Sequence, residues 1–478
     1  MNKVVGVVPM LLVVALLVGM VGCAPAATPT PAGQATQPPA ATPTAAQAAK
    51  PTAAPAAPVE KKPIVIGYVG NVNSPGTKPD IDVQKMAVDE INAAGGILGR
   101  PVNFVVEDGK GETALSVDAA TRMVMEHKAI LYSVEGRSEI NFATIEASAK
   151  LWNEYPHIYV CDGAMSEPIT DVAIDKGYEW VFRAWDPEAA HYCWINDTIK
   201  IWKDIIGAKK VAILWEDLAW TKLWREGDPK RNLPSWAELA EKSGLQVVYN
   251  KPLKARYGMY LPIFEECARA GAQVIYYVSS WYTDTEVFAK QWADSAAKDI
   301  PIMTYGGIGQ APGPFWQLTG GKGLGLLSVV GDYEYPFTSK TIPFLKNAKA
   351  RGITNLQWQP HFSYATIYLL KAAIEKAGTA DDVKAIMKAM EQVEIEFSLG
   401  TLKFETQRVK PFFHSRVMAD PKDPFKAVPK VFTYVVGQYQ QDGKWVPFYC
   451  PDWSLGYPDL NQPKNYKTPA ELRKAAGS

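Results

Sequence analysis

Residues 64–111 constrain the fold of this chain more than any other stretch. They open with IVIGYV, a run of β-branched and aromatic residues typical of a strand that is buried on both faces. A loop rich in Gly, Asn, Ser and Pro follows and includes Asn73. Apolar residues then recur at helical spacing until Gly95 and Gly96, and the run VNFVV predicts a second strand. The stretch therefore predicts a right-handed β-α-β crossover unit of a parallel sheet, whose first loop lies where such sheets bind ligands.

The same alternation of strand and helix recurs down the chain. Further strands are expected at 129–132, 157–161, 210–215, 246–249, 273–278 and 301–304, with helices near 113–124, 139–152, 235–242, 261–270, 284–296 and 361–376. The pattern restarts after about residue 184. Two similar α/β units in succession predict an α/β protein with two doubly wound lobes.

The opening stretch also resembles a known family. IGYVG followed by AVDEINAAGGILGRPVNFVVED is similar to the start of the type I periplasmic binding proteins that serve branched-chain amino acid ABC importers. The phrase DEINAAGGILGR at 89–100 is its most specific part, and a weaker resemblance extends over about 63–448. The resemblance implies two lobes that are joined by a three-strand hinge and close around a ligand.

The domain boundaries follow from the pattern and the resemblance together. The expected passages between lobes are VFRA at 181–184, a return near 331–336, and LGTLKF at 399–404. Lobe 1 is therefore expected to comprise 63–184 plus 332–396, and lobe 2 to comprise 185–331 plus 397–478. The long aromatic tail after about residue 410 is expected to pack against lobe 2.

The first 62 residues are expected to lie outside the fold. Residues 1–22 carry one early cation and an apolar run, which is typical of a secretory signal, with a transmembrane anchor as the alternative. MVGC at 20–23 resembles a bacterial lipobox, which implies that Cys23 is lipidated. Residues 23–62 are rich in Ala, Pro and Thr and predict a disordered tether. The chain is therefore expected to be exported and lipid-anchored, at the outer face of a bacterial cell membrane or in the periplasm.

Composition and motifs narrow the class of function. Basic and acidic side chains balance at 50 each, which argues against nucleic acid as a partner. No GxSxG, HExxH, GxxxxGK[ST] or CxxC motif occurs, and the 5 histidines show no metal-ligand spacing, so we expect neither an enzyme nor a cofactor or metal. After Cys23 four cysteines remain, which predict either buried free thiols or one disulfide.

The first-lobe candidates for ligand binding follow two expected strands. The loop at 133–139 is similar to the family's loop that offers amides and a hydroxyl to a ligand carboxylate, and Ser138 matches the hydroxyl. Arg137 is an addition that could bind a carboxylate or pair with Glu135 or Glu139. Three further candidates, in the segment CDGAM, are Asp162, Gly163 and Ala164. In that segment Met165 lacks the hydroxyl found in amino-acid binders, while loop aspartates such as Asp162 often bond their own backbone.

The second-lobe candidates are mostly aromatic. WEDLAW at 215–220 resembles the family motif YEDxxYG, in which the last aromatic residue, here Trp220, closes over the ligand. Trp281 and Tyr282 lie in the next loop at a strand end, although a core position is the alternative for each. Glu286 could meet a ligand amine, or it could serve as a dipole partner in the first turn of a helix.

We therefore expect an extracytoplasmic solute-binding component of an ABC import system. Its partners would be a small-molecule solute, either an amino acid or an aromatic or apolar carboxylate, and an ABC permease in the membrane. The chain is expected to be a monomer that touches the membrane only through its lipid anchor. A ligand-sensing module with the same fold is the alternative, and a secreted hydrolase is less favoured.

Overall fold

The computed structural model describes residues 62–281, 283–455 and 458–477. The described residues belong to one compact unit. The predicted signal segment, Cys23 and the predicted tether up to residue 61 lie outside the described residues, as does Tyr282. Within the described ranges, no helix is both long enough and apolar enough to cross a membrane.

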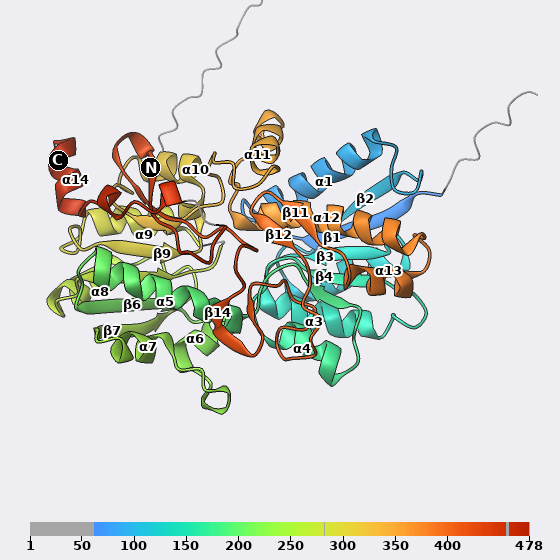
Figure 1. Cartoon of the computed structure of the whole chain (residues 1–478), viewed down its shortest axis with the longest axis horizontal. Coiled ribbons are helices and arrows are strands. Elements are labelled where there is room, and N and C mark those ends of the chain that lie inside the picture. Colours follow the sequence, from blue (N-terminus) through green and yellow to red (C-terminus); the bar gives the residue numbers. More distant parts are fainter. Residues whose placement is uncertain (1–61, 282, 456–457, 478) are drawn as a thin grey trace, which may run out of the picture. The chain divides into compact units, whose positions relative to one another are not determined.

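The first sheet contains five parallel strands (Figure 1). Their order is β2-β1-β3-β4-β5, and their bounds are β1 Ile64–Gly70, β2 Val102–Asp108, β3 Leu131–Val134, β4 Ile158–Cys161 and β5 Val181–Arg183. In the ladder, Ile66 lies between Phe104 and Leu131. The predicted crossover unit at 64–111 thus forms one side of this sheet, with β2 at the edge and β1 paired on both sides.

Helices cover both faces of the first sheet. Helices α1 (Lys78–Ala93) and α12 (Trp358–Ala377) pack on Ile64, Ile66 and Leu131, whereas α2 (Thr113–Met125), α3 (Ser138–Ala149) and α4 (Pro168–Asp175) pack on Val69 and Tyr132. Alternate residues of each strand point to opposite faces, so each face needs its own helical cover. Two more helices, α11 (Thr341–Ala350) and α13 (Val383–Met390), lie against α1 and α12 respectively.

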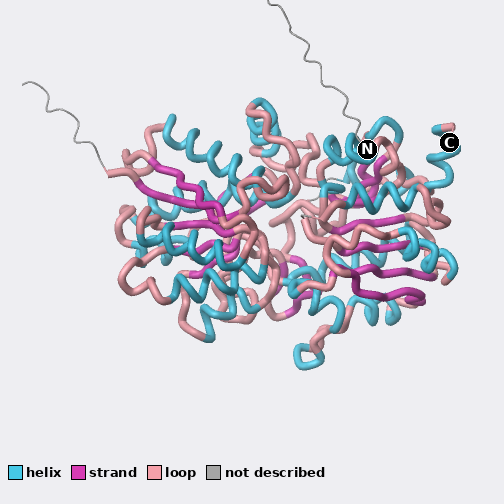
Figure 2. Tube along the Cα trace, turned by 180° about the vertical axis from the view of Figure 1, so that it is seen from behind, coloured by secondary structure: helices cyan, strands magenta, loops and turns pink. Residues whose placement is uncertain are grey.

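The second sheet has seven strands and is separate from the first (Figure 2). Its order is β16-β15-β10-β9-β8-β6-β7, with bounds β6 Lys210–Glu216, β7 Gln246–Leu253, β8 Val274–Val278, β9 Ile302–Tyr305, β10 Leu327–Val329, β15 Val436–Tyr439 and β16 Trp445–Tyr449. Strands β6 to β10 are parallel to one another, whereas β15 runs antiparallel to β10 and β16 antiparallel to β15. The aromatic tail therefore supplies the last two strands on one side of this sheet, with β16 at the edge.

Aromatic side chains hold the helices of the second sheet in place. Tyr276 in β8 contacts Trp202 and Trp236, which come from the segment after α5 (Tyr192–Lys200) and from α7 (Trp236–Lys242). The next residue, Tyr277, points to the opposite face and contacts Tyr260 and Phe288, next to α8 (Leu261–Arg269) and in α9 (Thr285–Ala293). Three shorter helices are α6 (Lys222–Glu226), α10 (Pro312–Thr319) and α14 (Pro469–Ala476).

The chain passes between the sheets three times. It leaves the first sheet after β5, returns after β10 to form α11 to α13, and leaves again after the hairpin of β11 (Ile395–Phe397) and β12 (Gly400–Leu402). A second small hairpin, β13 (Ala419–Asp420) and β14 (Asp423–Ala427), packs against α5. Between the passages, buried Arg416 forms an ion pair with buried Asp186. Three passages agree with the fold class that the sequence predicts.

Some predicted boundaries were wrong. The helix expected at 139–152 ends at Ala149, where the chain continues in turns, and the strand expected at 129–132 begins only at Leu131. The helix expected from residue 361 begins at Trp358, because Pro360 lies in its first turn, where a missing N–H costs nothing. The four described cysteines, Cys161, Cys193, Cys267 and Cys450, are buried free thiols, so the free-thiol alternative holds.

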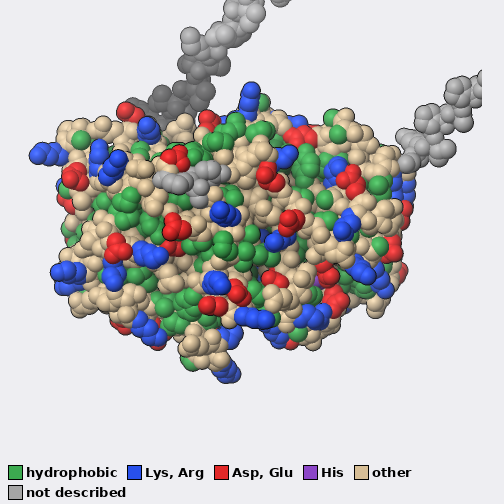
Figure 3. Space-filling view, viewed as in Figure 1, with side chains coloured by type: hydrophobic (Ala, Val, Ile, Leu, Met, Phe, Trp, Pro, Cys, Tyr) green, Lys and Arg blue, Asp and Glu red, His purple; other side chains and the backbone are tan. Residues whose placement is uncertain are grey.

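Charged side chains show no large field of one sign on the face drawn in Figure 3. Lysine and arginine side chains alternate there with acidic ones. This distribution agrees with the equal numbers of acidic and basic residues. A protein that binds nucleic acid would concentrate positive charge on one face.

Candidate functional site

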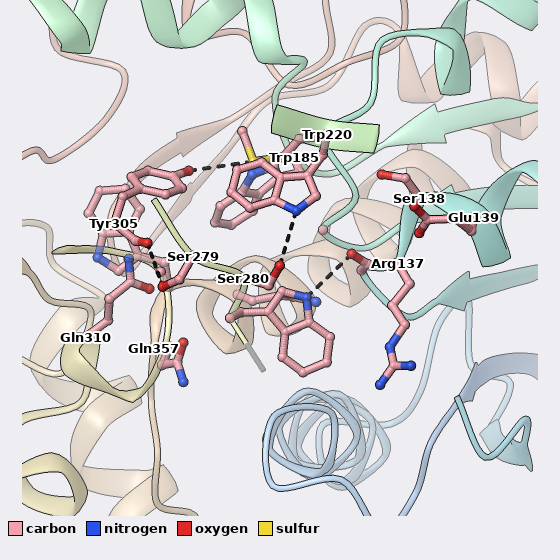
Figure 4. Close-up of a pocket in the computed structure, with 17 residues that line it drawn as sticks. Arg137, Ser138, Glu139, Trp185, Trp220, Ser279, Ser280, Tyr305, Gln310 and Gln357 are labelled. Carbon is pink, nitrogen blue, oxygen red and sulfur yellow. Dashed lines mark hydrogen bonds between the residues drawn. The ribbon is translucent and has the colours of Figure 1, made fainter. Parts of the chain in front are cut away.

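A cavity lies where the carboxyl ends of strands from both sheets meet. It contains about 640 Å³ of space not filled by protein atoms, including its mouth. Loops after β3, β4 and β5 line one side, and loops after β6, β8 and β9 line the other. The lining residues are Gly136, Arg137, Ser138, Glu139, Gly163, Met165, Trp185, Trp220, Ser279, Ser280, Trp281, Tyr305, Gly306, Gln310, Gln357, Trp358 and Gln359 (Figure 4). This is the position at which open α/β sheets bind ligands.

The amino end of α3 forms one wall of the cavity. Its N-cap residue, Arg137, has extended backbone angles, and its side chain does not cap the helix. Ser138, the first helical residue, is 2% exposed, and its hydroxyl has no hydrogen-bond partner among the described residues. The amides of a first helical turn have no acceptor within the helix. The start of α3 therefore presents the Ser138 hydroxyl and the N–H groups of a helix amino end, which favour an anionic group, at the cavity wall.

The Arg137 guanidinium is engaged within the first sheet's own loops. It donates to the carbonyl oxygen of Gly111 over 3.0 Å and forms an ion pair with Glu135, with 3.3 Å between Nε and Oε1. In Figure 4 the side chain extends away from Trp220. The ion-pair alternative therefore describes the present contacts of Arg137 better than a ligand clamp, and its pairing partner is Glu135.

Two buried glutamates position the loops that border the cavity. Glu135, after β3, accepts the Asn71 amide over 2.8 Å and the Thr77 hydroxyl over 3.3 Å. Glu216, the last residue of β6, accepts the Ser280 amide over 2.7 Å and the hydroxyl of Thr283. In each lobe a carboxylate thus holds a neighbouring loop by its backbone, and charge-assisted hydrogen bonds of this kind are strong.

Aromatic side chains form the opposite wall. The Trp220 indole donates to the Ser280 hydroxyl over 3.2 Å, which turns its ring toward the cavity. The Trp281 indole donates to the Gly136 carbonyl across the cavity over 3.4 Å. A Cβ on Gly76 would lie 2.0 Å from the Trp281 ring, so only glycine fits beneath it. The predicted placement of Trp220 and Trp281 at strand ends brings both to the cavity.

The other predicted site residues lie elsewhere. Asn73 is exposed in the loop after β1, and Ala164 is packed in the core beside α2 and α3. Glu286 lies in the first turn of α9, the position that the helix-dipole alternative requires. Burial raises the pKa of its carboxyl group. Asp162 is fully buried beneath the cavity and accepts the Ser363 hydroxyl over 2.6 Å. Burial raises the pKa of Asp162 to about 8.

The sequence reasoning missed the residues that reach the cavity from the passages between the sheets. Tyr305 ends β9 and could have been found by the same strand-end argument as Trp220. Its hydroxyl contacts the Met165 sulfur at 3.6 Å, joining loops of the two sheets. Trp185 directly follows the predicted passage at 181–184, which was the only signal for it. The segment 357–359 follows no predicted strand, and its only signal was Pro360 at a helix start.

The cavity is suited to binding rather than to covalent chemistry. Among its described lining residues only Arg137 and Glu139 carry charge, and Arg137 is already paired. In the part of the chain that the structure describes, no group of three or more His, Cys, Asp or Glu side chains is placed to hold a metal ion. Aromatic faces, amides and one unpaired hydroxyl recognise a small molecule by shape and hydrogen bonds.

Comparison with known proteins decides the family. The sequence model of the periplasmic binding proteins matches residues 63–417, most of the chain. The chain belongs to the periplasmic binding protein family. This assignment confirms the resemblance seen in DEINAAGGILGR and the prediction of a binding protein rather than an enzyme.

Individual relatives of this periplasmic binding protein agree with that assignment. It is 24% identical over 350 residues to a Leu/Ile/Val-binding protein homolog from Brucella melitensis, covering 71% of this chain and 87% of the relative. The substrate-binding protein LivJ from Streptococcus pneumoniae, solved in complex with isoleucine, superposes with a TM-score of 0.62 at 18% identity, covering 80% and 98% of the two chains. A solute-binding protein of an ABC transporter from Rhodopseudomonas palustris, solved with 3,4-dihydroxybenzoic acid, gives a TM-score of 0.63 at 15% identity, covering 82% and 98%. These structures confirm the type I fold.

Proposed function

We propose that this periplasmic binding protein captures a small organic acid between its two lobes and delivers it to an ABC permease. The observation that carries the proposal is Ser138. Its buried hydroxyl has no partner within the described part of the chain and lies at the uncapped amino end of α3 on the cavity wall. An unpaired buried hydroxyl costs free energy unless a ligand satisfies it, and the helix end favours an anion as that ligand.

The remainder of the cavity suits an apolar or aromatic body. Trp220, Trp281 and Tyr305 line it, and two of these rings are oriented by hydrogen bonds of their own indoles. Aromatic faces contribute about 0.5–1.5 kcal/mol beyond simple burial when they pack on an aromatic ligand. A carboxylate with a flat or branched apolar body satisfies both walls.

Contacts across the cleft explain how a ligand would favour a closed state. Arg231, between α6 and α7, donates to Glu167 at the start of α4 over 3.0 Å, and the Trp281 indole reaches Gly136. We assign residues 63–184 plus 332–396 to lobe 1 and 185–331 plus 397–478 to lobe 2, with the three passages as the hinge. A ligand shifts the open–closed equilibrium only by the difference in its affinity for the two states.

The proposal includes the cellular setting. The lipobox-like MVGC favours lipidation of Cys23, so the protein would be anchored outside the cytoplasm by a flexible tether and act as a monomer. A sensory role with the same fold is the alternative, in which the closed form contacts a receptor in place of a permease.

An aliphatic α-amino acid is the second candidate solute. The Brucella melitensis relative is named for Leu, Ile and Val, and the Streptococcus pneumoniae structure holds isoleucine. An α-ammonium group in this cavity would meet Glu139 as the single acidic side chain among the described lining residues, and Glu139 is exposed. This lack of a buried counter-ion favours the organic acid.

A thermal-shift screen of the full chain tests the proposal. Aromatic carboxylates, aliphatic acids, α-amino acids, amides and polyols are each added in excess. A ligand that binds only the folded state at 100 times its dissociation constant stabilises the protein by about 2.7 kcal/mol. We expect acids to raise the melting temperature and Ser138→Ala to reduce that shift. Stabilisation by amino acids alone would favour the second candidate, and no stabilisation by any class would contradict a solute-binding role.

A further inference from the structure

Hydrogen-bond donors at the start of α12 line the cavity without an acceptor. Trp358 and Gln359 are the first two residues of this helix and lie 3% and 8% exposed on the cavity wall. The Trp358 indole nitrogen and the Gln359 amide nitrogen have no partner among the described residues. Trp185, on the first passage between the sheets, is 8% exposed and adds a third donor, an indole nitrogen that also has no partner among the described residues. Three buried donors therefore border one cavity.

The backbone of α12 adds to this set. Gln357, the N-cap residue, has extended backbone angles, and its side chain does not cap the helix. The amides of Trp358 and Gln359 have no acceptor within the helix, since they precede its first complete turn. The partial positive charge of this helix end also favours a hydrogen-bond acceptor or an anionic group.

The start of α12 lies beside the entry to α3. A Cβ on Gly163 would lie 2.6 Å from the Gln359 amide nitrogen, and a Cβ on Gly136 would lie 3.1 Å from it. Glycine at both positions leaves room for the Gln359 side chain between the loops after β3 and β4. One cavity is thus bordered by the uncapped amino ends of two helices, each with its own side-chain donors.

Leaving so many donors buried and unpaired costs free energy that a ligand oxygen would recover. We infer that the start of α12, with Trp185, Trp358 and Gln359, is a second oxygen-binding site of the cavity. The solute then carries a second oxygen acceptor besides its carboxylate, as a hydroxyl, an oxo group or a second carboxylate. This inference rests on the proposed function, which assigns the first carboxylate to Ser138. A cationic group does not fit here, because indole edges and helix amino ends are positive.

Matched pairs of acids test the inference with the full chain. Isothermal titration compares benzoate with its 2-, 3- and 4-hydroxy derivatives and with benzene-1,4-dicarboxylate, and compares butanoate with 2-oxobutanoate and succinate. We expect at least one oxygen-bearing acid to bind about tenfold more tightly than its parent, which is the upper value of a net hydrogen bond.

Two variants locate the preference. Gln359→Met removes the amide at similar volume, and Trp358→Phe removes the indole N–H while keeping a ring. Each should weaken binding of the preferred acid about tenfold more than it weakens binding of the parent acid. Gln84→Met and Trp202→Phe are matched controls. Both side chains are buried, and their nitrogens have no partner among the described residues, yet neither residue lines the cavity.

The outcomes separate this inference from the proposed function. Equal affinity for parents and oxygen-bearing acids, or a preference that survives both Gln359→Met and Trp358→Phe, overturns the inference. If the parents still bind and Ser138→Ala weakens them, the proposed function stands alone. If no acid of the panel binds, both are overturned.

Discussion

The loops at the ends of the two sheets are held by the same device in different electrostatic surroundings. Glu135 and Glu216 are both buried, and each accepts a backbone amide and a hydroxyl from a neighbouring loop. Near Glu135 lie two more buried carboxyl groups, those of Asp80 and Asp162. Burial raises the pKa of Asp80, and the nearby Asp162 and Glu135 carboxyl groups raise it further. Glu216 has donors around it instead. The comparison teaches that a carboxylate at a strand end can position a loop in either setting. The crowded edge around Glu135 also contains the carboxyl group of Asp162, whose raised pKa couples the fold to pH.

The largest effect is expected when the buried carboxylate of Glu216, which holds the neighbouring loop, is changed. Glu216→Gln replaces one acceptor oxygen by an NH₂ group that faces a donor, so we expect a loss of about 2–4 kcal/mol in the free energy of unfolding. Urea unfolding measures this loss. Exposed Glu241→Gln is the control and should change stability by less than about 0.5 kcal/mol. An equally small effect of Glu216→Gln would mean that the loop at 279–283 is held by other contacts.

The second prediction concerns Trp220, whose indole donates to Ser280 in the loop that Glu216 holds. Trp220→Ala removes a ring from the cavity wall and should weaken binding of an aromatic acid about 30-fold, or about 2 kcal/mol. Trp220→Phe keeps a ring but loses the hydrogen bond to Ser280, so a smaller loss is expected. Isothermal titration of both variants with the aromatic acid measures the two losses of affinity. Unchanged affinity in Trp220→Ala would place the ligand away from this wall.

The third prediction tests the pH dependence of the crowded edge. Burial raises the pKa of Asp162 to about 8 from 3.8, so the folded state holds a proton that the unfolded state releases above about pH 4. The stability contributed by this proton is complete below pH 4 and is lost as the pH rises toward 8. Asp162→Asn mimics the protonated form. Its free energy of unfolding should therefore rise relative to that of the unsubstituted protein across this pH range, by at least about 1 kcal/mol at pH 9.

Thermal unfolding of both proteins from pH 4 to pH 9 measures that difference. Exposed Asp204→Asn serves as the control and should follow the parent at every pH. If the difference in stability between Asp162→Asn and the unsubstituted protein stays constant with pH, then Asp162 does not couple the fold to pH.

The smallest expected effect lies at the mouth of the cleft. Arg231→Gln removes the ion pair with Glu167, a partly exposed contact between the loops of the two sheets. Pairs of this kind contribute about 0.2–1 kcal/mol, so ligand affinity should fall by no more than about fivefold, and less at high salt. Titration at low and high ionic strength distinguishes a charge effect from lost packing, which salt would leave unchanged.

The fold followed from the sequence because its signals are local. Strand runs such as IVIGYV, the helix stop at Gly95 and Gly96, and DEINAAGGILGR each mark an element within a few residues. The site was predicted only where it follows strand ends, as with Ser138 and Trp220. Gln359 was not predicted as a site residue, because it follows Gly163 by about two hundred residues and reaches it only through the second passage of the chain. No local pattern encodes such a contact. The two roles considered for Arg137 differed only in rotamer, which the sequence does not determine.

The crystal structure of the protein with its most stabilising acid tests the central claim most directly. The account predicts the carboxylate in the cavity between the sheets, with oxygens about 3 Å from the Ser138 hydroxyl and the first amides of α3. An acid bound outside this cavity, or one whose carboxylate faces the tryptophans and leaves Ser138 unpaired, would contradict it.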